Sequence, residues 1–304
     1  MIDNLIKQGV SKTLLEKVIK YNENNFLKDN LKYRIPKEKT IYLGKEIWEQ
    51  AITAILQKSN ILLVGPKSTG KNLLASNLAQ LFHRPSWNIS LNINTDESQL
   101  LGVDTFKDNQ VTFRNGPITS ACMEGGFAVL DEINMAKNEA LSVLHSTLDD
   151  RRIIDIPGYD LIDIHPDTRF IATMNYGYLG TKELNEALVS RFLVIELPQI
   201  SDAQLEILIE NAHPNINRKI LKLYVKFFKD IELKVENSEI SSRALDLRGL
   251  LASISSIEMG LDLKNSLAMA IKNKTFDDFE KEIIDDLIKI NFSKNYTRSD
   301  VFER

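Results

Sequence analysis

The segment "ILLVGPKSTGKN" at residues 61–72 restricts the possible folds more than any other part of this chain. A short apolar run leads into a glycine loop, and the pattern after the loop is helical. Gly65 and Gly70 let backbone N–H groups turn inward, the start of the helix favours an anion, and Lys71 can reach outer phosphates. An ordinary strand-to-helix turn would leave Lys71 at a helix start, where the dipole disfavours a cation. The segment therefore predicts a phosphate site.

Two residues depart from the usual pattern of such a loop. Asn72 follows Lys71 where Ser or Thr normally supplies a hydroxyl ligand for Mg²⁺. Its amide oxygen is an acceptable ligand for a hard cation. Ser68 stands where a third glycine is usual and requires a compatible backbone angle. We therefore expect the loop to bind phosphate, with Asn72 as a weaker metal ligand.

Strand-like apolar runs alternate with helical patterns through the first two thirds of the chain. The runs are "NILLVG", "WNISL", "GFAVLDE", "RFIATMN" and "LVIELP", and helical patterns cover 72–82 and 137–149. Buried strands that alternate with helices predict an α/β fold with a parallel sheet covered on both faces. After Pro198 the periodicity is only helical. The expected domains are a helical N-terminal extension at 1–38, the α/β domain at 39–199 and a helical domain at 200–304.

Two segments interrupt the alternation. Residues 104–113 have β-prone runs around a polar Asp-Asn turn, and residues 153–164 repeat a pattern of Ile or Leu with Asp. Pro157 and Gly158 suit the centre of a type II turn between matching strands. Both segments are predicted to be β-hairpins, for which the simplest interpretation is a surface insertion.

Composition limits the functional classes. Hydrophobic residues make up 43% and charged residues 26% of the 304 residues, so a buried core is expected. The net charge of −4 argues against general binding to nucleic acid or to anionic membranes. The single cysteine, Cys122, allows no intrachain disulfide. No apolar run approaches the ~20 residues of a membrane span, and no signal peptide is recognisable. A cytoplasmic location is expected.

Polar side chains follow two of the predicted strands. Asp131 and Glu132 end "GGFAVLDE", and Asn175 ends "RFIATMN". The carboxyl ends of parallel strands border the ligand crevice. There Asp131 can hold Mg²⁺ through water, Glu132 can orient and polarise the attacking water, and an amide at 175 can contact the γ-phosphate or that water. Without the loop upstream, each would be an ordinary turn residue.

Two arginines are further candidates. Arg191 in "LVSRF" directly precedes a predicted strand, and it is either a surface charge or a finger that reaches a phosphate in a neighbouring subunit. "SSRALDLRGLLASI" is predicted to open a helix, with Ser241 or Ser242 as its cap. Arg243 would then lie in the first turn, where the dipole opposes a cation by about 0.3–1 kcal/mol unless an anionic ligand binds. A solvated arginine and a ligand-binding arginine are equally compatible with this pattern.

The ordered series "GPKSTGKN", "VLDEIN", "ATMN", "LVSRF" and "SSRA" resembles the AAA+ ATPases of the MoxR group. "GYLGTKELNEALVSRF" is similar to the relatives associated with nitric-oxide reductase and Rubisco activation. The resemblance covers roughly residues 40 to 260. It implies a five-stranded sheet, a helical lid, and a ring, often hexameric, with ATP at subunit interfaces. It also implies that the two hairpins face the ring pore or a partner, and that a protein with a von Willebrand factor A domain assists in remodelling protein or metalloenzyme targets.

The same resemblance assigns roles by position. It implies that Lys71 binds phosphate, that Asp131 holds Mg²⁺, that Glu132 activates water, and that Asn175 is the first sensor, whereas Asn72 is a departure from the family pattern. It implies that Arg191 is a finger acting across the interface and that Arg243 is a second sensor. The residues implied to cradle the phosphates are Gly65, Pro66, Lys67, Ser68, Thr69, Gly70, Lys71 and Asn72.

Asn72 leaves the rate of hydrolysis open. We expect ATP to bind and to be hydrolysed slowly, in a remodelling ATPase. A nucleotide-gated assembly scaffold with little hydrolysis is the alternative, and a GTP-using or nucleic-acid-handling relative is disfavoured by the acidic balance.

Overall fold

The computed structural model describes residues 1–107, 109–156, 158–176 and 184–303. The chain forms two compact units, one made of residues 1–66 and 70–198 and the other of residues 67–69 and 199–304. Within the described residues, no helix combines the length and apolar character needed to cross a membrane.

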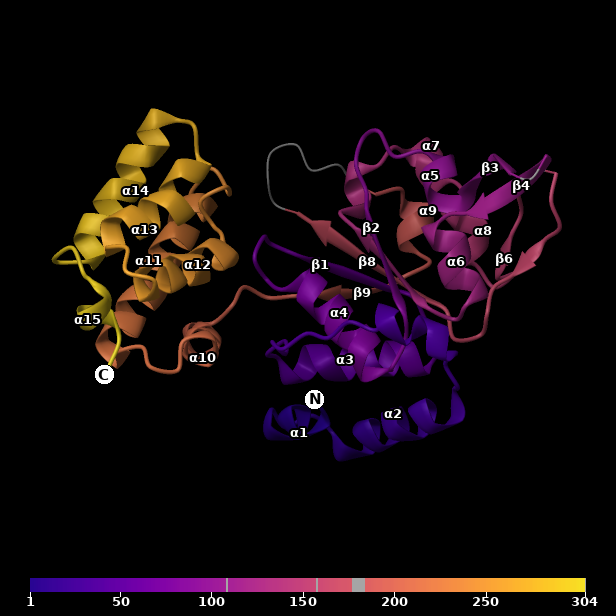
Figure 1. The fold of residues 1–304 in the computed structure, drawn as a ribbon, viewed down its shortest axis with the longest axis horizontal. Helices are drawn as coiled ribbons and strands as arrows, with labels where there is room; N and C mark the ends of the chain where they lie inside the picture. Colours follow the sequence, from indigo (N-terminus) through magenta and orange to yellow (C-terminus); the bar gives the residue numbers. More distant parts are fainter. Residues whose placement is uncertain (108, 157, 177–183, 304) are drawn as a thin grey trace. The chain divides into compact units, whose positions relative to one another are not determined.

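A five-stranded parallel sheet forms the centre of the first unit (Figure 1). Its strands are β1 (Ile61–Gly65), β2 (Ser86–Ser90), β5 (Phe127–Asp131), β8 (Arg169–Asn175) and β9 (Leu193–Glu196). They lie in the order β2-β5-β8-β1-β9, and every neighbouring pair is parallel. This confirms the predicted α/β fold. The order also brings the carboxyl ends of β5, β8 and β1 side by side.

Each face of the sheet carries its own core, because side chains alternate along a strand. On β1, Ile61 and Leu63 pack into one core, whereas Leu62 and Val64 pack into the other. The first core is closed by α1 (Ile2–Lys7), α2 (Lys12–Asn24), α3 (Lys45–Leu56) and α4 (Lys71–Leu81). The second is closed by α5 (Glu97–Leu101), α6 (Pro117–Met123), α7 (Asn138–Leu141), α8 (Leu144–Leu148), α9 (Glu186–Val189) and two 3-10 turns, η1 (Asp29–Arg34) and η2 (Ile133–Met135).

One predicted helix is interrupted, and the single cysteine is a packed side chain. The helical pattern at 137–149 is divided into α7 and α8 by residues 142–143. Cys122 on α6 is fully buried, and burial raises the pKa of its thiol to about 12, as suits a packed side chain.

Both predicted hairpins are present. β3 (Gly102–Lys107) pairs antiparallel with β4 (Gln110–Asn115), between α5 and α6, and β6 (Ile153–Ile154) pairs antiparallel with β7 (Ile162–Asp163). The turn residue Pro157 and the Asp of the Asp-Asn turn at position 108 lie outside the described residues. The hairpins touch each other, because the Tyr159 hydroxyl donates a hydrogen bond to Asp104 and its ring lies 5.0 Å from the Phe113 ring.

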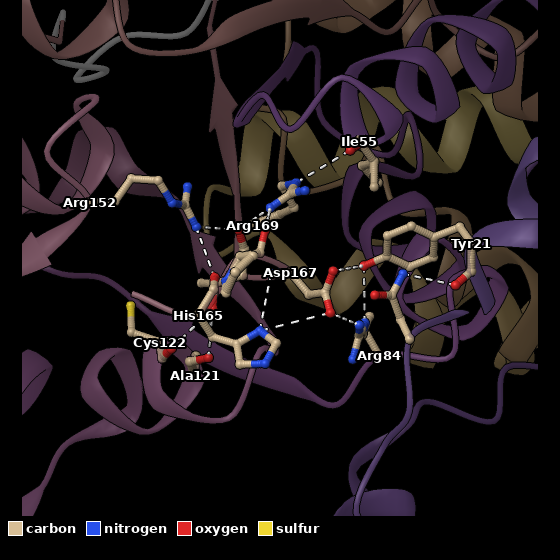
Figure 2. A network of polar contacts seen from close by, with 12 residues as sticks. Tyr21, Ile55, Arg84, Ala121, Cys122, Arg152, His165, Asp167 and Arg169 are labelled. Atoms are coloured by element: carbon tan, nitrogen blue, oxygen red, sulfur yellow. Dashed lines mark hydrogen bonds and ion pairs between the residues drawn. The ribbon is translucent and has the colours of Figure 1, made fainter. Parts of the chain in front are cut away.

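A buried polar network connects α2 to the segments that precede β2 and β8, at the end of the sheet where the strands begin (Figure 2). The Tyr21 hydroxyl donates to Asp167 Oδ1 over 3.0 Å and accepts from Arg84 Nε over 3.1 Å. Arg84 also forms an ion pair with Asp167 and is only 2% exposed. Burial raises the pKa of Tyr21 to about 12, so its hydroxyl stays protonated and can donate. The N-terminal helices therefore belong to the packed structure of the first unit.

The second unit is helical. It consists of α10 (Asp202–Ala212), α11 (Arg218–Glu236), α12 (Leu247–Glu258), α13 (Leu263–Ala270), η3 (Lys272–Lys274), α14 (Asp278–Asn291) and α15 (Arg298–Val301). In its core the Phe292 ring contacts the rings of Tyr224 and Phe227 edge-on, with centroids 5.3 and 5.6 Å away.

The predicted cap at Ser241 or Ser242 is wrong. α12 begins at Leu247, and Asp246 caps it by accepting a hydrogen bond from the backbone N–H of Arg248 over 3.0 Å. A carboxylate at this position both satisfies an N–H and favours the positive end of the helix dipole. Ser241 is bound instead to Glu280. Arg243 consequently precedes the helix, so the predicted dipole penalty does not apply to it.

Candidate functional site

The glycine loop joins β1 to α4, as the sequence indicates. β1 ends at Gly65, and Gly70 is the N-cap of α4 with φ of +86°. A Cβ built on Gly70 would lie 3.2 Å from the Tyr42 ring, so both the dihedral angle and the packing favour glycine there. Ser68 has φ of +66°, which is the left-handed angle that replacing a glycine at this position required.

Lys71, the first residue of α4, is almost buried. It is 7% exposed, and its ammonium donates to the carbonyl oxygens of Gly65 over 2.9 Å and Pro66 over 2.6 Å. Burial lowers the pKa of Lys71 to about 8, although Asp131 and Glu132 act in the opposite direction. A desolvated cation at a helix start is an environment that a phosphate group would improve.

Asp131 at the end of β5 accepts two side-chain hydrogen bonds. The Asn72 amide nitrogen donates to Oδ2 over 2.8 Å, and the Thr173 hydroxyl donates to Oδ1 over 2.6 Å. Asn72, the unusual residue of the loop, thus contacts Asp131, the carboxylate predicted to hold Mg²⁺. Asn72 and Asp131 together present amide and carboxylate oxygens, the ligand types that Mg²⁺ prefers.

Glu132 has an unusual backbone conformation and two partners on β8. Its φ of +55° and ψ of +49° are left-handed. Its N–H donates to Thr173 Oγ1 over 3.1 Å, and its carboxylate accepts from the Asn175 amide over 3.4 Å. Asn134, which is 3% exposed, donates to the Asn175 carbonyl over 3.3 Å. The structure thus brings together the predicted residues Asp131, Glu132 and Asn175.

Sequence reasoning missed Thr173 and Asn134. A usable signal existed for the first of these, because residues two apart on a strand face the same side, so Thr173 and Asn175 share a face of β8. Asn134 follows the strand in a 3-10 turn, where an asparagine is common for local reasons alone.

The described residues contain no cluster of three or more His, Cys, Asp or Glu side chains arranged to enclose a metal ion. Mg²⁺ is commonly held by one or two protein ligands, with waters and substrate phosphates completing its octahedron. The pair Asn72 and Asp131, beside a helix N-terminus and Lys71, fits a magnesium–nucleotide complex of that kind.

Arg191 lies near the start of β9, at the opposite end of the strands from the glycine loop. It follows α9, its guanidinium donates to the Ala187 carbonyl, and its Nε is buried with no partner among the described residues. It lines a cavity of about 630 Å³ together with Lys58 and Arg152. Leu193 is paired with Ile61, the first residue of β1, whereas the loop follows the last residue, roughly 13 Å further along the strand. Arg191 is therefore not brought to Lys71 of its own chain.

The remaining candidates lie in the second unit. Residues 67–69 group with it, and so does Arg243, whose guanidinium carbon lies 6.0 Å from the centre of the Phe276 ring. The roles expected of Lys67, Thr69 and Arg243 stay predictions.

Comparison with known proteins supports the interpretation of this site. The family described as AAA domain (dynein-related subfamily) matches residues 60–192, which include the loop, Asp131, Glu132, Asn175 and Arg191. An uncharacterized protein of Staphylococcus epidermidis is 31% identical over 261 residues, covering 83% of this chain and 99% of that protein. The uncharacterized protein YojN of Bacillus subtilis is 30% identical over 247 residues, covering 80% and 81%. An uncharacterized protein of Staphylococcus aureus is 34% identical over 239 residues, covering 77% and 90%.

The similarity to these relatives extends beyond the matched domain, because it includes most of the chain at 30% identity or more. The matched domain contains the strand ends that carry the predicted site. Residues 60–192 thus form an AAA domain of the dynein-related subfamily, a kind of domain that binds and hydrolyses ATP.

Proposed function

We propose that this chain is a MoxR-like ATPase that binds ATP with Mg²⁺ at the carboxyl edge of its sheet and hydrolyses it. The observation that carries the proposal is the convergence of Lys71, Asp131 and Glu132 with Asn175 at the ends of three adjacent strands and their loops. A lysine at a helix start, two consecutive carboxylates and an amide form the set of groups that phosphoryl transfer to water uses.

Each side chain has a distinct task in this proposal. The Lys71 ammonium binds the outer phosphates and offsets their charge. Asp131 and Asn72 would hold Mg²⁺, which when bound acts as a Lewis acid on the phosphate oxygens. The Glu132 carboxylate orients the attacking water and accepts its proton. The amide of Asn175 holds that carboxylate in place, over the 3.4 Å contact already present.

Glu132→Gln tests the hydrolytic role, because an amide of the same shape cannot accept the proton. We expect the variant to bind ATP as the wild type does, measured by ATP-dependent thermal stabilisation, and to release phosphate at least about 100-fold more slowly. Lys71→Ala is the control that loses stabilisation by ATP. Wild-type turnover in Glu132→Gln would remove this residue from the mechanism, and undiminished stabilisation of Lys71→Ala would refute the phosphate loop.

We further propose that the chain works as a homo-oligomeric ring, expected to be a hexamer, which remodels protein or metalloenzyme targets with a partner that carries a von Willebrand factor A domain. Two observations support a multi-subunit protein machine. Arg191 lies far from its own loop, and the β3–β4 hairpin carries Phe106 and Val111, which are 74% and 64% exposed. Native mass spectrometry with ATP tests the ring, and a persistent monomer would contradict it.

A nucleotide-gated scaffold is the second candidate. The hydrogen bond from Asn72 to Asp131 favours it, because this contact occupies one oxygen of the carboxylate expected to serve Mg²⁺. The two candidates differ in phosphate release. A scaffold assembles with ATP and shows no turnover, even with its partner protein, whereas the remodelling ATPase releases phosphate in a Glu132-dependent way.

A further inference from the structure

We propose that Thr173 is a positioning residue that sets the geometry of both Asp131 and Glu132 for hydrolysis. This inference rests on the ATPase activity proposed above. Thr173 lies inside β8 and is 1% exposed. Its effect on hydrolysis must therefore be transmitted through the two carboxylate residues that it contacts.

One hydroxyl serves two consecutive residues. A threonine hydroxyl can donate one hydrogen bond and accept others. Here it donates to Asp131 Oδ1 over 2.6 Å and accepts the backbone N–H of Glu132 over 3.1 Å. The carboxylate that would hold Mg²⁺ and the backbone that carries the water-activating carboxylate are thus fixed by the same buried atom.

The backbone at Glu132 explains why this support is needed. The ladder between β5 and β8 ends with Leu130 opposite Ala172, and the chain then turns out of the sheet at Glu132 with φ of +55°. A non-glycine residue adopts this angle only where surrounding contacts determine it. The Glu132 N–H has left the ladder, and Thr173 Oγ1 replaces the missing strand carbonyl as its acceptor.

Thr173 and Asn175 divide the task. They lie two residues apart on β8 and so face the same side. Thr173 fixes the backbone of Glu132, while the Asn175 amide contacts its carboxylate over 3.4 Å. Removal of the hydroxyl should leave ATP binding through Lys71 intact and should misplace Asp131 and Glu132.

Thr173→Val removes the hydroxyl and keeps the shape of the side chain. At saturating Mg²⁺ we expect kcat to fall about tenfold or more, with KM for ATP within about threefold of the wild type, because Lys71 still binds the phosphates while Asp131 and Glu132 are misplaced. Thr173→Ser, which restores the hydroxyl, should recover most of the rate. The matched control is Thr119→Val, since Thr119 is equally buried and its hydroxyl donates to the Leu101 carbonyl at 2.7 Å.

A second readout does not depend on turnover. The affinity for Mn²⁺ can be measured by electron paramagnetic resonance in the presence of a non-hydrolysable ATP analogue. Mn²⁺ should bind at least about fivefold more weakly to Thr173→Val than to Thr119→Val, because Asp131 has lost its hydrogen-bond donor. If the wild type proves inactive, the ATPase proposal fails and this metal affinity still tests Thr173.

Three results would overturn the role of Thr173. Turnover of Thr173→Val equal to that of Thr119→Val would show a merely structural residue. A Thr173→Ser variant as slow as Thr173→Val would exclude the hydroxyl as the cause. Unchanged Mn²⁺ affinity in Thr173→Val would show that Asp131 does not depend on this contact.

Discussion

The side-chain amide of Asn72 donates a hydrogen bond to Asp131 over 2.8 Å, so the residue that replaces the usual hydroxyl of the phosphate loop is bound to the carboxylate proposed to hold Mg²⁺. The nitrogen of the amide is committed to Asp131, and the oxygen is the atom of Asn72 able to serve a cation. The unusual residue is therefore part of the candidate site.

Asn72→Thr should raise turnover or lower the Mg²⁺ requirement, because a hydroxyl is the common ligand here and Asp131 Oδ2 is released. Asn72→Ala loses both the ligand and the contact with Asp131, and we expect metal affinity and rate to fall about tenfold, equivalent to ~1.4 kcal/mol. A Mg²⁺ titration of phosphate release measures both variants. If Asn72→Ala releases phosphate as fast as the wild type at every Mg²⁺ concentration, the Asn72 amide does not contribute to the metal site.

ATP binding should become pH-dependent above about pH 8. The pKa of Lys71 is lowered to about 8 by burial, and a bound phosphate would raise it. Below pH 8 the ammonium is already present. At pH values between about 8 and the raised pKa of Lys71 in the ATP complex, Lys71 is neutral in the free protein and charged in the complex. ATP binding then takes up a proton, so affinity should fall up to about tenfold per pH unit. Calorimetry in buffers of different ionisation enthalpy measures the uptake.

Lys71→Arg is the control for this linkage, because a guanidinium does not titrate in that range. Its binding should take up no proton at pH 9. Equal proton uptake by Lys71→Arg and the wild type would assign the pH dependence to another group.

Arg191→Ala should bind ATP normally and hydrolyse it roughly 1,000-fold more slowly, the scale of other arginine fingers. Arg191 lies at the other end of the strands from its own loop, so an ATP molecule that it reaches must be bound to a neighbouring subunit. Mixing Arg191→Ala with Lys71→Ala should then restore some turnover, because ATP on the first variant meets the arginine of the second. Verified mixed rings without any recovery would argue against this role.

Asp167→Asn should destabilise the first unit by about 3–5 kcal/mol, because Arg84 is buried and would keep its charge without a carboxylate. Tyr21→Phe should cost about 1 kcal/mol, since it removes a single hydroxyl from the network. Urea unfolding monitored by circular dichroism measures both. Lys32→Ala, which breaks an exposed ion pair with Asp29, should cause no measurable change. Similar stability of Asp167→Asn and Lys32→Ala would show that the polar network of Tyr21, Arg84 and Asp167 does not stabilise the fold.

Replacing Phe106 and Val111 by Ser should leave ATP binding and basal turnover unchanged and should weaken stimulation by a partner protein. The two side chains are opposite each other on β3 and β4 and are exposed, so the fold does not need them. Partner-stimulated phosphate release measures the effect. Thr105→Ala, on the other face of this hairpin, is the control. Full stimulation of phosphate release in the double variant would show that these two side chains are not needed for coupling to the partner.

The sequence by itself determined the sheet, the loop and the order of the candidate residues. Apolar runs of strand length can be read directly because both faces of a parallel sheet are buried. The glycines and Lys71 in "GPKSTGKN" mark the loop because backbone angles and charge at a helix start are local properties. Both hairpins were also predictable, from turn residues and matching flanks.

Tertiary structure decided what depends on residues distant in the chain. The contact of Asn72 with Asp131 joins residues 59 positions apart, and Thr173 reaches Glu132 across 41. Ser241 likewise binds Glu280, 39 positions away, and does not cap α12. Hydrogen-bond competition of this kind has no local pattern, because the better partner is known only once the chain has brought both together.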